Sequence, residues 1–193
     1  MKHLKKSLLP LFLAIAMLVM ALSVGATETA SSPEKQNLKK LTTSLNYEST
    51  SYTNKKKTPK LIVEGVSLER NKDYTASYSN NLEIGTAKAI FTGIGQYKGK
   101  VTKTFTITRQ KLHIGNMTLK KGKKASLVAY VYLKDVETKM PVSQIKYKSS
   151  NKGVATVSSS GKVTTKKKGT CKITLTPKDT KHYAAKTITI TVN

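Results

Sequence analysis

Side chains that could catalyse a reaction are few in this chain and lie far apart in the sequence. Enzyme sites need a nucleophile with a base, paired carboxylates or a set of metal ligands. Past the N-terminal segment there are two histidines, His113 and His182, without a second histidine or a cysteine at ligand spacing. Asp135 and Glu137 stand two positions apart, but no calcium-loop pattern surrounds them. We expect the histidines at a junction or on the surface, and the two acids in a solvated loop.

The chain also lacks the short motifs that mark common active sites. It contains no Gly-x-Ser-x-Gly elbow and no phosphate-binding loop. The spacing of Gly93 and Gly95 is too short a pattern to indicate a nucleotide site. The sequence therefore predicts a protein that is not an enzyme and that needs neither a cofactor nor a metal. An enzyme with an unrecognised site is kept as an alternative.

Lysine is the residue type whose abundance suggests a chemistry. The chain has 35 Lys and Arg against 10 Asp and Glu, a formal net charge of +25. Residues 109–193 hold 19 basic and 3 acidic residues, so most of the excess lies there. Such a field attracts polyanions in a salt-dependent way. The predicted polyanion-binding residues crowd two connections and are Lys120, Lys121, Lys123, Lys124, Lys166, Lys167 and Lys168.

Two interpretations of these lysines stay open. Lysines in turns can bind an anionic ligand, or they can simply be solvated, resist edge-to-edge strand pairing and keep the protein soluble. Aromatic residues do not alternate with them as in proteins that bind single-stranded nucleic acid, so nucleic acid is an unlikely partner. The predicted partners are anionic cell-wall polymers or acidic glycans, with host or envelope proteins as further candidates.

The N-terminus has the pattern of a secretory signal peptide. Lys2, Lys5 and Lys6 precede an apolar run over residues 8–22, and small residues follow up to Ala26. We predict a signal peptide over residues 1–26, cleaved between Ala26 and Thr27. An uncleaved anchor is the alternative, but the run is shorter than the roughly 20 residues that a spanning helix needs. No second span and no sortase-type Leu-Pro-x-Thr-Gly motif is present, so we expect a secreted or cell-envelope protein.

Period-two alternation predicts the folded part of the chain. Polar residues 27–41 are expected to form a flexible lead. Residues 42–108 show alternating apolar positions, including Ala87, Ala89 and Phe91, and residues 109–116 form a short junction. Lys103 falls on an apolar strand face, and we expect its stem to snorkel at the rim.

The segment 147–175 has the strongest strand pattern. Cys171, Ile173 and Leu175 alternate with polar residues after a Ser- and Gly-rich turn. Cys171 is the one cysteine, so no internal disulfide can form, and we expect it to be a buried small hydrophobe. Antibody-type domains use a Cys–Trp–Cys core, which this chain lacks.

This segment resembles the bacterial immunoglobulin-like domain, group 2. The resemblance rests on Tyr147, Ser149-Ser150-Asn151, Val154-Ala155-Thr156-Val157, Gly161-Lys162-Val163 and Gly169-Thr170 with Ile173. It implies an immunoglobulin-like sandwich over residues 117–193, and such domains do not rely on the antibody core.

The predicted first domain, residues 42–108, resembles a different module over about residues 46–108, a small β-sandwich-like repeat of secreted and surface proteins of Gram-positive bacteria. The matching stretches are residues 73–81, 85–87 and 93–97. Together the two resemblances imply an all-β chain with two tandem immunoglobulin-like β-sandwich modules after the signal peptide.

The function expected from charge and resemblance is non-catalytic binding or adhesion at the cell envelope. The basic second module would contact anionic wall polymers or acidic glycans. A structural spacer without a ligand is the alternative from a different class.

Overall fold

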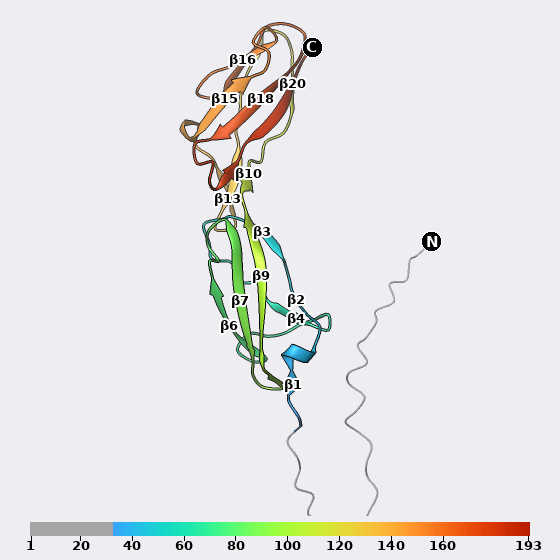
Figure 1. The fold of residues 1–193 in the computed structure, drawn as a ribbon. Coiled ribbons are helices and arrows are strands. Elements are labelled where there is room, and N and C mark those ends of the chain that lie inside the picture. Colours follow the sequence, from blue (N-terminus) through green and yellow to red (C-terminus); the bar gives the residue numbers. More distant parts are fainter. Residues whose placement is uncertain (1–32) are drawn as a thin grey trace, which may run out of the picture. The chain divides into compact units, whose positions relative to one another are not determined.

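A computed structural model of the chain describes residues 33–193, whose regular elements are nearly all β-strands (Figure 1). The predicted signal peptide, residues 1–26, and its cleavage position between Ala26 and Thr27 lie outside the described residues. Residues Glu34–Asn193 form one compact unit, whose buried apolar residues separate into two clusters. We call residues 34–108 the N-terminal half and residues 109–193 the C-terminal half. The all-β fold class is confirmed, and the proposed domain boundaries stay a prediction.

Three sheets enclose the apolar cluster of the N-terminal half. The largest has the strand order β3-β9-β7-β6, in which β7 and β9 are antiparallel and β3 runs parallel to β9. The second has the order β2-β4-β5, and a short parallel pair joins β1 to β8. The elements are β1 (Gln36–Asn37), η1 (Leu38–Lys40), β2 (Thr43–Leu45), β3 (Ser49–Ser51), β4 (Leu61–Val63), β5 (Val66–Ser67), β6 (Tyr74–Ser79), β7 (Gly85–Gly93), β8 (Tyr97–Lys98) and β9 (Lys100–Thr108).

The alternating residues of this half are buried as the sequence pattern predicts. Ala87, Ala89 and Phe91 of β7 all lie in the core, and Ala87 pairs across the strands with buried Phe105 of β9. Successive side chains of a strand point to opposite faces, so one face of β7 is apolar and the other polar. Phe91 meets Tyr74 of β6 edge to face, with ring centroids 5.2 Å apart.

Lys103 lies half-buried on the core side of β9. Its ammonium group donates a hydrogen bond of 2.6 Å to the carbonyl of Thr43 in β2. The lysine therefore bridges the two larger sheets of this half, and its charge has a backbone acceptor where the stem passes the core.

The flexible lead predicted for residues 27–41 is wrong for the part that the structure describes. Leu38 is fully buried in the N-terminal cluster, and β1 pairs with β8. The Asn37 side chain accepts a hydrogen bond of 3.1 Å from the Lys39 N–H and caps η1. One buried leucine among polar neighbours has no periodicity, so no pattern in the sequence could indicate this docking.

The C-terminal half places two sheets face to face and adds a hairpin. One sheet has the order β11-β20-β18-β15 and the other β12-β17-β16; β13 pairs with β14, and β10 pairs in parallel with β19. The elements are β10 (Gln110–Lys111), β11 (Met117–Leu119), β12 (Lys124–Ser126), β13 (Tyr130–Leu133), β14 (Val136–Lys139), η2 (Val142–Gln144), β15 (Ile145–Ser149), β16 (Ala155–Val157), β17 (Lys162–Thr165), β18 (Gly169–Pro177), β19 (Tyr183–Ala184) and β20 (Lys186–Val192).

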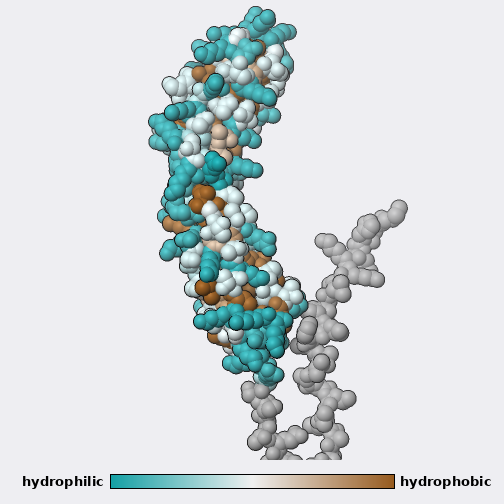
Figure 2. All heavy atoms as spheres, in the orientation of Figure 1, coloured by the Kyte–Doolittle hydropathy of each residue, from teal (hydrophilic) through white to brown (hydrophobic). Residues whose placement is uncertain are grey.

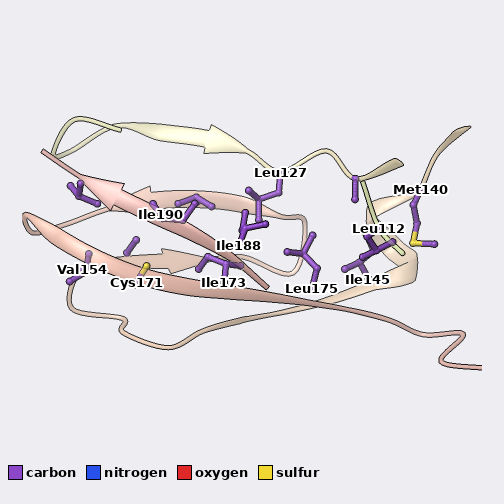
Figure 3. Packing of buried hydrophobic residues seen from close by; sticks show 14 of the residues in the cluster. Leu112, Leu127, Met140, Ile145, Val154, Cys171, Ile173, Leu175, Ile188 and Ile190 are labelled. Carbon is purple, nitrogen blue, oxygen red and sulfur yellow. The ribbon is translucent and has the colours of Figure 1, made fainter. Parts of the chain in front are cut away.

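The core of this half follows the predicted alternation along its longest strand. Cys171, Ile173 and Leu175 of β18 are buried, and Ile188 and Ile190 of the neighbouring strand β20 lie beside them (Figure 3). Cys171 is a free thiol in this core, as expected. Along residues 33–193 no helix is long and apolar enough to cross a membrane.

Candidate functional site

The two predicted lysine turns lie next to each other at one end of the C-terminal half. Buried Thr165 precedes the turn that contains Lys166. The Thr165 hydroxyl lies 2.9 Å from the carbonyl oxygen of Lys120 and 3.0 Å from that of Lys123. The Thr165 N–H also donates to the Lys123 carbonyl at 3.0 Å. Because Thr165 is the last residue of β17, it ties the β11–β12 turn to the β17–β18 turn.

A further lysine joins this surface without any signal in the sequence. Lys152 stands alone in an Asn-Lys-Gly turn, and that turn meets the second lysine turn where the Lys166 N–H donates to the Val154 carbonyl at 2.8 Å. All these lysine side chains are exposed, and hydrophilic atoms gather at this end, the top of the view in Figure 2. We call the set the lysine end: Lys120, Lys121, Lys123, Lys124, Lys152, Lys166, Lys167 and Lys168.

The acidic residues of this half lie at its opposite end. Asp135 occupies the β13–β14 turn and Asp179 follows β18, whereas the lysine end adjoins the start of β18. The nine residues of β18 separate the two ends by about 26 Å, at about 3.3 Å a residue. Within residues 33–193 no lysine of the lysine end forms an ion pair. Its positive field is therefore not neutralised locally.

Asp135 is exposed, as expected, and it lies in a tight, ordered hairpin turn. Lys134 and Asp135 both have left-handed backbone, with φ of 50° and 67°, as a two-residue hairpin turn requires. The Asp135 carboxylate pairs with Lys55 of the N-terminal half at 3.0 Å. That contact lowers the pKa of Asp135. Glu137, by contrast, is exposed in β14, so the two acids do not form a carboxylate pair.

His182 lies at the contact between the two halves. The sequence predicted a position either at a junction or on the surface, and His182 occupies the first of these. Its side chain is 16% exposed; Nε2 is 2.9 Å from the Glu83 carboxylate and Nδ1 is 2.7 Å from that of Asp179. The imidazole stacks on the ring of Tyr52 with centroids 4.1 Å apart. The hydrogen bond with Glu83 raises the pKa of His182, burial opposes this, and Asp179 adds to the rise. A protonated imidazole here bonds two carboxylates and an aromatic face.

We expect the chain to lose thermal stability as pH rises past the pKa of folded His182. That pKa lies above the ordinary value of 6.5, so the contribution is complete below pH 6.5 and disappears at higher pH. Glu83 and Asp179 have lowered pKa values, so their contribution is lost only in acid. The melting temperature should be about 2–4 °C higher at pH 6 than at pH 8.5.

Two substitutions separate this effect from other titrations. His182→Gln should abolish the difference in melting temperature, whereas His113→Gln should leave it unchanged, because His113 is exposed and has no ion-pair partner in the described chain. The nearby cation Lys181 stays charged throughout this pH range, because its hydrogen bond with Glu83 raises its pKa. A pH dependence that persists in His182→Gln would contradict the assignment.

The residues considered for metal binding do not come together. Within residues 33–193 no group of three or more His, Cys, Asp or Glu side chains could hold a metal ion. His113 is exposed, and its ring stands perpendicular to that of Tyr132 with centroids 5.0 Å apart. Cys171 lies in the core, away from both histidines. The feature that stands out in this half is therefore the lysine end.

The geometry described above agrees with one family comparison. Residues 101–188 match the family model of the bacterial Ig-like domain (group 2). This part of the chain is therefore similar to a bacterial Ig-like domain. The matched range begins within β9 of the N-terminal half, earlier than the residue 117 expected from the sequence. It includes the hairpin, all of β15 and β18, and the first three residues of β20. No curated protein matches the chain.

Several solved structures resemble the chain at low identity. Domains 4 and 5 of the S-layer protein SbsC are 18% identical, with 74% of this chain and 93% of that chain covered and a TM-score of 0.33. A C-terminal fragment of intimin, in complex with the intimin-binding domain of its translocated receptor, is 16% identical over 79% and 64%, with a TM-score of 0.32. Drosophila N-cadherin domains EC1-4 are 11% identical over 78% and 49%, with a TM-score of 0.31. The likeness does not extend to a ligand or an activity.

Proposed function

We propose that the chain is a secreted, non-catalytic protein of the bacterial cell envelope that binds anionic wall polymers through its lysine end. The observation that carries the proposal is the gathering of eight exposed lysines, from three separate turns, none of which forms an ion pair within residues 33–193. The bacterial Ig-like domain and the predicted signal peptide are consistent with a place outside the cytoplasm. Acidic glycans share the negative charge and are the second ligand class for the same surface.

The chemistry of lysine defines what this surface can recognise. Each ammonium group is a hydrated point charge on a flexible stem, with no planar fork for a bidentate contact. All eight stand in or beside turns and are exposed. Binding should therefore depend on charge density rather than on the exact structure of the polymer, and it should weaken steeply with salt.

The test is a titration of the full mature chain with poly(glycerol phosphate), a wall-type polyanion, at low and high salt. Replacing four lysines of one turn with glutamine should weaken binding about 30-fold at low salt, from about 0.5 kcal/mol for each charge and tenfold for each 1.4 kcal/mol. Unfolding should be unaffected, since exposed turn lysines contribute little to stability. The changed residues are Lys120, Lys121, Lys123 and Lys124.

A control variant removes the same charge elsewhere. It replaces four exposed lysines of the N-terminal half that form no ion pair among those found in residues 33–193. We expect it to lose less than about threefold in affinity. Equal losses in both variants would show that only net charge matters, and absence of binding at low salt would favour the structural spacer. The control residues are Lys39, Lys40, Lys88 and Lys100.

A further inference from the structure

A second surface, far from the lysine end, combines a hollow with an exposed aromatic ring. The hollow has a volume of about 550 Å³ and lies where the two halves meet. Threonine and serine hydroxyls contribute to its wall, together with the cations Lys57, Arg109 and Lys111 and the ring of Tyr132. Asp135 is the acid in the wall, so the lining carries a net positive charge. The proposed function makes no use of this hollow.

Lys57 is the unusual residue of the wall. Its side chain is 9% exposed, and lysine is rarely buried to this extent unless it is paired. The ammonium group donates to the Thr53 hydroxyl at 2.6 Å, and the Asp135 carboxylate lies 3.8 Å away. An ammonium group has three donors, and its partners within residues 33–193 are the Thr53 hydroxyl and the more distant Asp135 carboxylate. Burial lowers the pKa of Lys57, and the charge of Asp135 opposes this.

The backbone around Lys57 is fixed by a buried asparagine. The Asn81 side-chain amide donates to the Lys57 carbonyl at 2.8 Å, and the Lys57 N–H donates to the Asn81 carbonyl at 2.7 Å. The position of the buried ammonium group is thus set by the fold before any ligand arrives.

The ring of Tyr132 is equally well positioned. Buried Gln110 donates from Nε2 to the Tyr132 carbonyl and accepts from the Tyr132 N–H with Oε1, both at 2.8 Å. The edge contact with His113 supports the ring from one side, and 37% of the residue stays exposed. An exposed, rigid tyrosine ring offers an apolar face and a hydroxyl group. The C–H face of a pyranose ring is the common partner of such a surface.

We propose that this hollow binds an acidic sugar of the uronic acid class. Its carboxylate binds the remaining donor of Lys57 and is attracted by the charges of Arg109 and Lys111. Its hydroxyl groups meet the wall hydroxyls and Asp135, and its ring packs on Tyr132. Within residues 33–193 the Arg109 side chain makes one long contact, 3.5 Å to the Thr180 carbonyl, and its guanidinium can donate two hydrogen bonds to a carboxylate. The site goes beyond the proposed function and does not depend on it.

The test uses the full mature chain and a galacturonic acid tetrasaccharide at 1 M salt. The Debye length is then about 3 Å, which suppresses charge-only binding at the lysine end. We expect measurable binding of the uronate and none of the matching neutral galactose tetrasaccharide. Tyr132→Ala and Lys57→Met should each weaken binding at least about tenfold. Equal binding of the neutral sugar, or no uronate binding at all, would overturn the proposal.

Tyr130 supplies a matched control. It lies two residues away on the same strand with 38% exposure but is not part of the wall, so Tyr130→Ala should keep full affinity. The glutamine variant of the lysine end should also leave uronate binding at 1 M salt intact while weakening low-salt binding of poly(glycerol phosphate) about 30-fold. Loss of uronate binding in either control would place the ligand elsewhere and overturn the proposal.

A measurement on the unmodified protein covers the case in which Lys57→Met fails to fold. Amide chemical shifts in the NMR spectrum should change on uronate addition at Lys57, Arg109 and Tyr132. Shift changes confined to other residues would contradict the site. Absence of uronate binding would not contradict the proposed function of the lysine end, because that function is tested separately with poly(glycerol phosphate) at low salt.

Discussion

Cys171→Lys is expected to prevent folding of the C-terminal half, whereas Cys171→Ala should fold with a loss of about 1 kcal/mol. Cys171 is 4% exposed and pairs across the strands with Ile190 in the centre of the core. A lysine there would be a charge without a partner, and an unpaired buried ion costs several kcal/mol. That cost is comparable with the whole stability of a small domain, about 5–15 kcal/mol. Alanine removes only the small sulfur group.

A neighbouring position controls for the lysine itself. Thr170 is exposed on the other face of the same strand, so Thr170→Lys should fold with nearly unchanged stability. Circular dichroism and urea unfolding measure all three variants. Two results would show that the Cys171 face of β18 is not buried. One is rapid reaction of the Cys171 thiol with a labelling reagent in the native chain, and the other is a Cys171→Lys variant as stable as Thr170→Lys.

Gly161→Ala is expected to destabilise the chain by about 2–3 kcal/mol, and Gly122→Ala by only about 1 kcal/mol. Both glycines have left-handed backbone, with φ of 74° and 77°, where a side chain costs about 1–2 kcal/mol. A Cβ at Gly122 would meet no atom within 4 Å, but a Cβ at Gly161 would lie 2.9 Å from the Tyr147 hydroxyl oxygen. The difference between the two variants therefore measures the clash with Tyr147.

Tyr147→Phe provides the matched test of that clash. The Tyr147 hydroxyl is buried and has no hydrogen-bond partner within residues 33–193, so its removal should leave stability unchanged or raise it by about 1 kcal/mol. In a double-mutant cycle, Tyr147→Phe should restore part of the stability lost in Gly161→Ala and none of that lost in Gly122→Ala. Urea unfolding of the variants gives the coupling free energy. Zero coupling would mean that the tyrosine shifts away without cost.

Period-two alternation was a sound guide to which residues are buried. Phe91 and Ile173 lie in the cores because alternation reports the face of a strand, and that information is local. It could not indicate that Leu38 docks, because one apolar residue carries no period. It also could not pair strands that are far apart in the sequence, such as β3 with β9.

The candidate sites were predictable to different degrees for the same reason. The lysine runs are visible in the sequence, but their meeting through Thr165 and the addition of Lys152 depend on contacts between distant turns. Lys57 gave no signal, since it stands among other lysines at residues 55–57 and only the fold buries it. Contacts across the two halves, such as that of His182 with Glu83, likewise arise from tertiary structure.

The parallel pairing of β11 with β20 sets how the C-terminal half would respond to mechanical tension. Met117, Thr118 and Leu119 lie opposite Ile190, Thr191 and Val192, and both strands run in the same direction. A pull that enters before β11 and leaves after β20 would draw the two strands past each other. The hydrogen bonds between them would then be loaded together in shear rather than opened one after another. The same arrangement recurs in β3 and β9, so each half has the geometry of a force-bearing link.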